Sequence, residues 1–287
     1  MKQLNENIFH QYNKWKTGYV RKENSLQLRL QKFLDDYKVN KNSVFYNKMP
    51  NCTISKDGQK VNVKGLVNIL IHDEYLINGK LPIPFAEVKG IFNINGCDDL
   101  ISLEGAPEKV GKNFLCDCCV NLTSLKGAPE KIGRRFDCSY CDKITSLEGA
   151  PEKVDWNFFT YNCPNLTSLE GVTEEVGGDF SCSDCPKLTS LEGAPEKVGG
   201  DFSCNGCPNL TSLVGAPKEV ACNFDCCECS ELTSLVGAPK KVGGDFICYN
   251  CPKLTSLEHL PKKMGCLEVN IRFKGKIPSD ISVVYHY

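Results

Sequence analysis

The sequence lacks any long apolar segment. No stretch of its 287 residues approaches the roughly 18 consecutive apolar residues that a membrane-spanning helix needs. The first residues, Met1 to Lys16, mix polar and charged side chains and contain no apolar run like that of a secretory signal. We therefore expect no membrane association and a cytoplasmic location, where thiols are kept reduced.

The common signatures of catalysis are also missing. No phosphate-binding loop, dinucleotide fingerprint or zinc-binding histidine and glutamate helix is present. The chain has only four histidines, and none provides a base for a cysteine nucleophile: His10, His72, His259 and His286. We therefore expect no enzyme activity, no catalytic residue, no bound metal and no cofactor.

Cysteine, in contrast, is abundant. The chain has 19 cysteines, a net charge of -1 and 41% hydrophobic residues, so it can bury a core while carrying an unusual number of thiols. The odd count argues against a fully paired disulfide framework. In a reducing compartment, such cysteines indicate metal binding, a redox role or simple packing.

A single fixed period organises most of the chain. Phenylalanine recurs eight times at the interval that separates Phe92 from Phe114, without an insertion: Phe92, Phe114, Phe136, Phe158, Phe180, Phe202, Phe224 and Phe246. Leucine or isoleucine follows each phenylalanine at the position of Leu100, and a second leucine follows at the position of Leu103. Valine, isoleucine or methionine then follows at a third apolar position. Such a period predicts a solenoid in which each repeat is one turn.

Fourteen of the cysteines follow the same period. The first column lies two positions after the phenylalanine: Cys116, Cys138, Cys182, Cys204, Cys226 and Cys248. The second column lies five positions after it: Cys97, Cys119, Cys141, Cys163, Cys185, Cys207, Cys229 and Cys251. Ile94 and Thr160 replace the first cysteine in two turns, which a packing position tolerates and a metal ligand does not. We therefore expect both columns to pack as small apolar side chains in the interior.

One repeat, FSCSDCPKLTSLEGAPEKVGGD from Phe180 to Asp201, contains the pattern F-x-C-x-x-C-x-x-L-T. This pattern resembles the cysteine-containing form of the leucine-rich repeat over roughly residues 50 to 270. The resemblance implies a leucine-rich-repeat horseshoe with short parallel strands and few helices in the repeats. The L-T-S-L-x-G-A-P stretch resembles uncharacterised leucine-rich-repeat proteins of bacteria and phages, from which no activity can be carried over.

Four regions are expected along the chain. Residues 1–48 show helical spacing of apolar side chains and are predicted to form two basic helices. Residues 49–91 are predicted to contain a capping hairpin around Asp57-Gly58 and a degenerate first repeat that begins at Leu70. Residues 92–266 form eight repeats. Residues 267–287 form a C-terminal cap, in which Leu267 comes one position early in the period.

The N-terminal region is basic. Residues 1–48 contain ten lysines and arginines and four acids, a net charge of +6, whereas the remainder carries -7. A basic helical segment can contact nucleic acid, but a solvated helical face explains the same composition because no nucleic-acid-binding motif accompanies it. Nucleic-acid binding through these helices is therefore retained as an alternative, with affinity that would fall steeply with salt.

The strand positions that point outward differ from turn to turn. They are Arg135, Asp137 and Ser139 in one turn and Asn157, Phe159 and Tyr161 in the next. Exposed aromatic and arginine side chains are enriched at protein interfaces, although they also pack on their neighbours. The candidate partner-binding residues are Arg134, Arg135, Trp156, Phe159, Tyr161, Ile247 and Tyr249.

Five cysteines lie outside the two columns: Cys52, Cys118, Cys222, Cys227 and Cys266. Cys227 falls at an outward strand position, where an exposed and reactive thiol is expected. A metal-binding or redox protein that uses these thiols is the second alternative. The main prediction is a non-enzymatic module that binds a protein partner on its curved sheet, in a bacterial or phage factor that contacts a host.

Overall fold

The computed structural model describes residues 52–55, 59–68, 76, 78–81 and 83–287. The predicted helices of residues 1–48 lie outside the described residues, as does Leu70. The chain divides into two units, Met1–Val44 and Phe45–Tyr287, and the second contains all the described residues. Among these residues, no helix has the length and apolar content needed to cross a bilayer.

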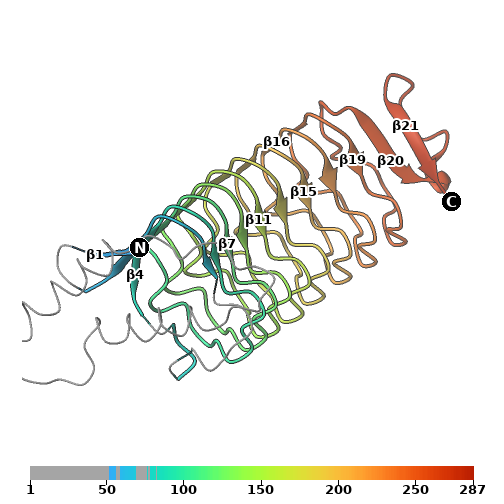
Figure 1. The fold of residues 1–287 in the computed structure, drawn as a ribbon. Helices are drawn as coiled ribbons and strands as arrows, with labels where there is room; N and C mark the ends of the chain where they lie inside the picture. The colour runs from blue at the N-terminus through green and yellow to red at the C-terminus, as the bar shows by residue number, and fades with distance from the viewer. Residues whose placement is uncertain (1–51, 56–58, 69–75, 77, 82) are drawn as a thin grey trace, which may run out of the picture. The chain divides into compact units, whose positions relative to one another are not determined.

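The described chain winds into a β-solenoid of about nine turns with almost no helix. Sheet A has ten strands, in the order β1 (Cys52–Ile54), β2 (Val61–Val63), β4 (Phe85–Val88), β6 (Lys109–Val110), β8 (Lys131–Ile132), β10 (Lys153–Val154), β12 (Glu175–Val176), β14 (Lys197–Val198), β16 (Glu219–Val220) and β18 (Lys241–Val242). Sheet B has eleven: β3 (Val67–Asn68), β5 (Phe92–Asn93), β7 (Phe114–Leu115), β9 (Phe136–Asp137), β11 (Phe158–Phe159), β13 (Phe180–Ser181), β15 (Phe202–Ser203), β17 (Phe224–Asp225), β19 (Phe246–Ile247), β20 (Cys266–Asn270) and β21 (Ser282–His286). Figure 1 shows successive turns side by side, with the strands of each sheet aligned.

Each regular turn therefore contributes two strands, although the repeat pattern predicts only one. In the predicted strand, Phe180 and Cys182 are buried and Ser181 is half-buried, as the alternation of side chains in a strand requires. The second strand lies at the third apolar position, where Val198 is buried and Lys197 is exposed. Its two residues pair with the equivalent residues of the turns on either side. Two residues are too few to produce an alternation that sequence analysis can detect.

The core consists of apolar columns that run through the turns. The eight repeat phenylalanines are fully buried. Most neighbouring rings stack, as Phe202 and Phe224 do with centroids 5.2 Å apart and planes 6° apart, whereas the Phe158 ring is tilted against its neighbours. Burying each such ring stabilises the fold by about 1.5–3 kcal/mol.

Glycines allow neighbouring turns to approach each other closely. Gly215 has a φ of +89°, and a Cβ atom added there would lie 2.2 Å from the backbone nitrogen of Glu192. A Cβ atom on Gly199 would lie 2.3 Å from the carbonyl oxygen of Gly177. The corners of the turns are thus packed backbone against backbone, which explains the repeated glycines of the sequence.

The N-terminal end contains the predicted antiparallel pair. β1 pairs with β2, with Cys52 opposite Val63. The first turn differs from the prediction, because its sheet B strand begins at Val67, which pairs with Phe92. Val67 lies three positions before the predicted start of this repeat, so the interval to Phe92 is longer than the regular period. Its later part follows the period, since Val88 pairs with Val110.

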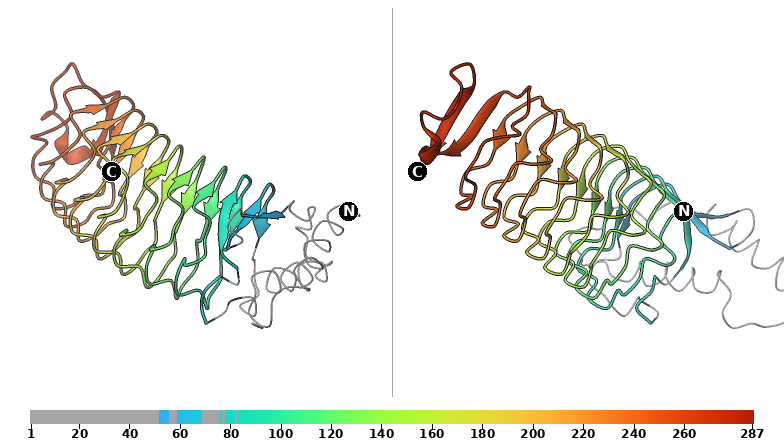
Figure 2. Two further views of the ribbon diagram at one scale, coloured as in Figure 1. Left: turned by 90° about the vertical axis from the view of Figure 1, so that its left-hand side faces the viewer. Right: turned by 180° about the vertical axis from the view of Figure 1, so that it is seen from behind.

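The C-terminal end contains the predicted shift of one position, because Leu267 pairs with Phe246. β20 and β21 then pair in parallel, with Leu267 opposite Val283. The chain from Leu267 to Val283 is shorter than a regular turn, and this last turn has no strand in sheet A. Sheet A ends at β18, next to a single bridge between Lys241 and Lys263. Figure 2 shows β20 and β21 at the end of the stack.

Candidate functional site

The outward face of sheet B brings three of the predicted residues together. The Arg135 guanidinium lies over the Phe159 ring, with its carbon 4.6 Å from the ring centroid. The rings of Phe159 and Tyr161 lie 6.0 Å apart, and Tyr161 meets Tyr140 edge to face at 5.3 Å. We call Arg135, Tyr140, Phe159 and Tyr161 the aromatic cluster. It combines cation–π and aromatic contacts on two neighbouring turns.

An ion pair with a buried carboxylate supports the aromatic cluster. Arg135 pairs with Asp137, whose side chain is almost fully buried. Asp137 also accepts a hydrogen bond from the backbone amide of Ser139, with 3.1 Å between nitrogen and oxygen. Asp137 and Ser139 are therefore buried, although they were predicted to be solvent-exposed positions of the outward face. Because an unpaired buried carboxylate is costly, Asp137 holds the Arg135 guanidinium in place.

Tyr140 is the member that the sequence analysis missed. It is 45% exposed and has a φ of +56°. Its amide donates to the Tyr161 carbonyl oxygen at 3.0 Å. The equivalent position holds small or polar residues in the other regular turns, Cys118, Asn162 and Gly206 among them. An aromatic residue at a position that requires a left-handed backbone is the signal that could have identified it.

Burial and the carboxylate of Asp137 raise the pKa of Tyr161 above its ordinary value. The Tyr161 hydroxyl can donate a hydrogen bond to a ligand beside the exposed ring of Tyr140.

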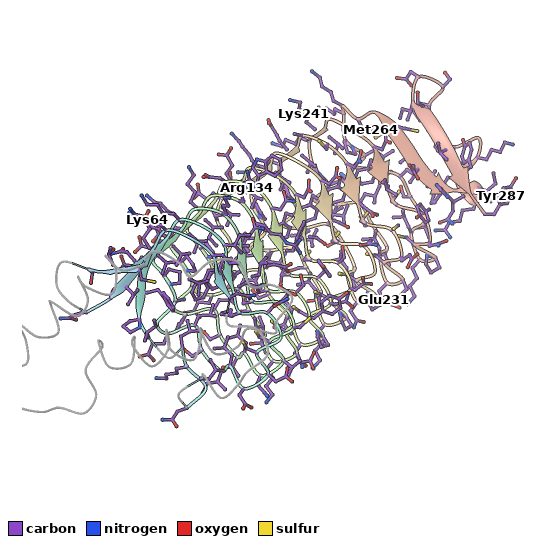
Figure 3. All side chains as sticks on the ribbon, viewed as in Figure 1. Lys64, Arg134, Glu231, Lys241, Met264 and Tyr287 are labelled. Carbon is purple, nitrogen blue, oxygen red and sulfur yellow. The ribbon has the colours of Figure 1, made fainter. Side chains whose placement is uncertain are left out.

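Trp156 and Arg134 lie at the corner between the two sheets. Trp156 is 63% exposed, and its amide donates to the Arg134 carbonyl oxygen at 3.2 Å. Figure 3 shows Arg134 along the side of the stack where the sheet A strands lie. These two residues therefore form the border of the aromatic cluster on the side of sheet A.

Ile247 and Tyr249 do not join the aromatic cluster. Three turns separate them from it, and Tyr249 stacks on His286 of β21 with centroids 4.1 Å apart. His286 lies 2.9 Å from the Glu268 carboxylate. Tyr249 is therefore in contact with the C-terminal strands, and four strand spacings place it about 19 Å from Tyr161.

The acidic residues that lie between the aromatic cluster and Tyr249 have a structural role. The Asp179 carboxylate accepts the Asp201 amide at 3.0 Å, and Asp201 accepts the Asn223 amide at 2.8 Å. Asp245 continues the same series by accepting the Cys266 amide at 2.8 Å. These side chains link neighbouring turns while keeping the middle of the face acidic.

No match is found among protein-family models, curated proteins or solved structures. The chain is therefore characterised by its own geometry, a β-solenoid with turns of about 22 residues. The aromatic cluster is the part of its surface where the candidate binding residues come together.

The cysteine columns link the turns through their thiols. Each second-column thiol from Cys119 onward donates to the carbonyl oxygen of the first-column position in the preceding turn, over 3.2–3.4 Å between sulfur and oxygen. The acceptors include Ile94 and Thr160, because the carbonyl remains when the side chain changes. This explains why the first column tolerates replacement while all eight turns keep the second cysteine.

Most of the column thiols are held in the protonated state, whereas a hydrogen bond from the Cys204 thiol lowers the pKa of Cys229. Burial raises the pKa of Cys185 and of Cys251 to about 12. Burial also raises the pKa of Cys116, Cys182 and Cys226 well above the ordinary value. These groups therefore act as buried hydrogen-bond donors and not as thiolate nucleophiles.

The cysteines outside the columns have different surroundings. Cys227 is 4% exposed, so the expectation of an exposed thiol is wrong. Burial, followed by its hydrogen bond to Asp225, raises its pKa. Cys118 and Cys222 are exposed, Cys266 is partly exposed and Cys52 is buried. Among the described residues, no group of three or more histidine, cysteine, aspartate or glutamate side chains is arranged so that it could hold a metal ion.

Removing a second-column thiol should destabilise the fold more than removing a first-column thiol. Cys207→Ala deletes a donor 3.3 Å from the Cys182 carbonyl oxygen, whereas Cys182→Ala deletes a weaker contact of 3.7 Å to Ser203. Both changes remove the same buried volume. We expect Cys207→Ala to cost about 1–3 kcal/mol more, because it leaves a buried carbonyl unsatisfied. Urea unfolding of both variants measures this difference, and equal costs would contradict the role of the second column.

Proposed function

We propose that the protein is a non-enzymatic module that binds a protein partner at the aromatic cluster on sheet B. The observation that carries this proposal is the half-exposed set of Phe159, Tyr161 and Tyr140 beside a fixed guanidinium. Tyrosine and arginine side chains that are already ordered lose little conformational entropy when a partner covers them. The short parallel strands support the cluster on a regular sheet.

Two further features belong to this proposal. The F-x-C-x-x-C-x-x-L-T pattern supports kinship with the leucine-rich repeats of bacteria and phages, and a factor that contacts a host is the context we propose. The buried thiols of the columns support a reducing compartment such as the cytoplasm.

The double variant Phe159→Ala/Tyr161→Ala should lose the partner while remaining folded. Truncation of two interface aromatic residues typically costs about 2 kcal/mol or more, so we expect binding to weaken at least about 30-fold. Pull-down from the native cell, followed by titration of the partner found, measures this loss. Val214→Ala/Val236→Ala is the matched control, because these residues are exposed apolar side chains in the loops of two other turns. Identical partner lists and affinities for both double variants would refute the proposal.

A further inference from the structure

The C-terminal end of the solenoid has a cavity of about 870 Å³. It exists because the last turn is short: β20 and β21 extend sheet B, whereas sheet A ends at β18. From the segment that leads from β20 to β21, which includes η2 (Ile271–Phe273), the side chains of Phe273, Ile277 and Ile281 line this cavity, and no strand of the segment joins sheet A. The end of the core on the side of sheet A is therefore open.

The cavity is lined by apolar side chains that are only half-buried. They come from the last regular turn and from the cap: Leu257, Leu260, Met264, Ile277 and Ile281. At the position of Leu257, the seven preceding turns have a fully buried leucine, such as Leu235. Leu257 is half-exposed because no further turn packs on it. The volume lies within the range of ligand-binding cavities.

Lysines surround the opening. Lys262, Lys263 and Lys276 line the cavity, and Lys240 and Lys241 lie on the adjacent turn, where Lys241 pairs with Lys263. In the part of the chain that the structure describes, these five exposed lysines make no ion pair.

Acidic groups are fewer at this end. Two carboxylates, Glu258 and Asp280, also line the cavity, and Glu219 lies beside Lys241. Figure 3 shows Lys241 and Met264 on the same side of the stack, next to the end. The opening is therefore predominantly basic.

From these observations we infer a second binding site, which takes an acidic peptide segment with a large apolar side chain. The apolar side chain fills the cavity beside Met264 and Leu257, and the acidic residues pair with Lys262 and Lys263. The peptide backbone extends sheet A beside Lys263, where no further strand follows among the described residues.

Charge favours an acidic peptide over two other possible occupants of the cavity, a second copy of the protein and residues 1–48 of the same chain. A second copy of the same end would place lysines against lysines. Residues 1–48 carry ten basic and four acidic residues, so they do not complement a lysine-rich opening either.

The test is selection of random dodecapeptides displayed on phage against the full-length protein. We expect enrichment of sequences that combine Asp or Glu with Leu, Ile, Met or Phe. A labelled synthetic copy of the most enriched peptide is then titrated by fluorescence anisotropy. Lys262→Glu/Lys263→Glu should weaken its binding at least tenfold, and Ile277→Asp should do the same by making the cavity polar.

Two controls define the result. Lys109→Glu/Lys131→Glu reverses two lysines in the same column of sheet A at the other end and should leave binding unchanged. Phe159→Ala/Tyr161→Ala should also leave it unchanged, which separates this site from the aromatic cluster. The inference is overturned if no acidic and apolar consensus emerges, if the two lysine variants weaken binding equally, or if light scattering shows a dimer that Lys262→Glu/Lys263→Glu dissociates.

Discussion

Raising the pH from about 8 to about 10 under reducing conditions should unfold the solenoid. Burial raises the pKa values of most column thiols in the folded state, to about 12 for Cys185 and Cys251, with Cys229 as an exception. In the unfolded chain, these thiols ionise near about pH 8.5. Above that pH the unfolded state binds fewer protons than the folded state, so stability is complete below it and falls until the folded pKa values are reached.

The size of this effect follows from the number of thiols. Each buried thiol removes about 1.4 kcal/mol of stability per pH unit above its unfolded pKa. About ten thiols acting together remove about 14 kcal/mol per pH unit, which equals the whole stability of an ordinary domain. Circular dichroism during an alkaline titration under nitrogen should show the loss of β-structure with a midpoint between about pH 9 and about pH 10.

A variant with fewer ionisable thiols is the control. Thr160 shows that threonine fits the first column, so the triple variant Cys182→Thr/Cys204→Thr/Cys226→Thr should fold and shift the alkaline midpoint upward. A midpoint above about pH 11 in the unmodified protein, where tyrosines and lysines also titrate, would contradict the assigned role of the thiols.

Truncation of two adjacent phenylalanines in β11 should affect different properties: Phe158→Ala should reduce stability, and Phe159→Ala should reduce partner binding. Phe158 is fully buried and packs against Phe136 and Phe180, with centroids 4.9 Å and 5.4 Å away. Phe158→Ala should lower the free energy of unfolding by about 3–5 kcal/mol, because it leaves a cavity in the middle of the stack. Phe159→Ala removes a half-exposed ring from the aromatic cluster and should cost no more than about 1.5 kcal/mol.

The two variants should also differ in their affinity for the partner. Phe159→Ala should weaken binding although the protein stays stable, whereas Phe158→Ala should bind normally under conditions where it remains folded. Urea unfolding and partner titration on the same two samples measure both effects. If Phe159→Ala unfolded as readily as Phe158→Ala, the outward ring would be a core residue and not a binding residue.

The period made the interior predictable. The columns of phenylalanine, cysteine and leucine are buried because each turn repeats the same inward positions, and the early position of Leu267 follows from counting along the chain. The second strand at Lys197–Val198 was not predictable, because its regularity exists between turns and not along the chain.

The outward face was less predictable because it depends on side-chain packing between turns. Asp137 is buried because it pairs with Arg135, and Cys227 is buried beside Asp225 and Tyr249. Strand alternation predicts on which face of the sheet a side chain lies. It does not predict whether side chains of neighbouring turns cover that side chain. The cavity at the C-terminal end likewise depends on the length of the cap relative to sheet A, which the repeat pattern does not contain.

The thiol hydrogen bonds make the turns interchangeable. From Cys119 onward, each second-column cysteine bonds to the turn before it, and its own turn offers the equivalent carbonyl to the turn that follows. Excision of residues 180–201 would place the turn of Phe202 against the turn of Phe158, where Cys207 would meet the Thr160 carbonyl to which Cys185 now donates. A gene that encodes such a chain can therefore gain or lose one repeat at a time and still encode a protein with a buried core. The number of turns can change while the contacts between neighbouring turns stay the same.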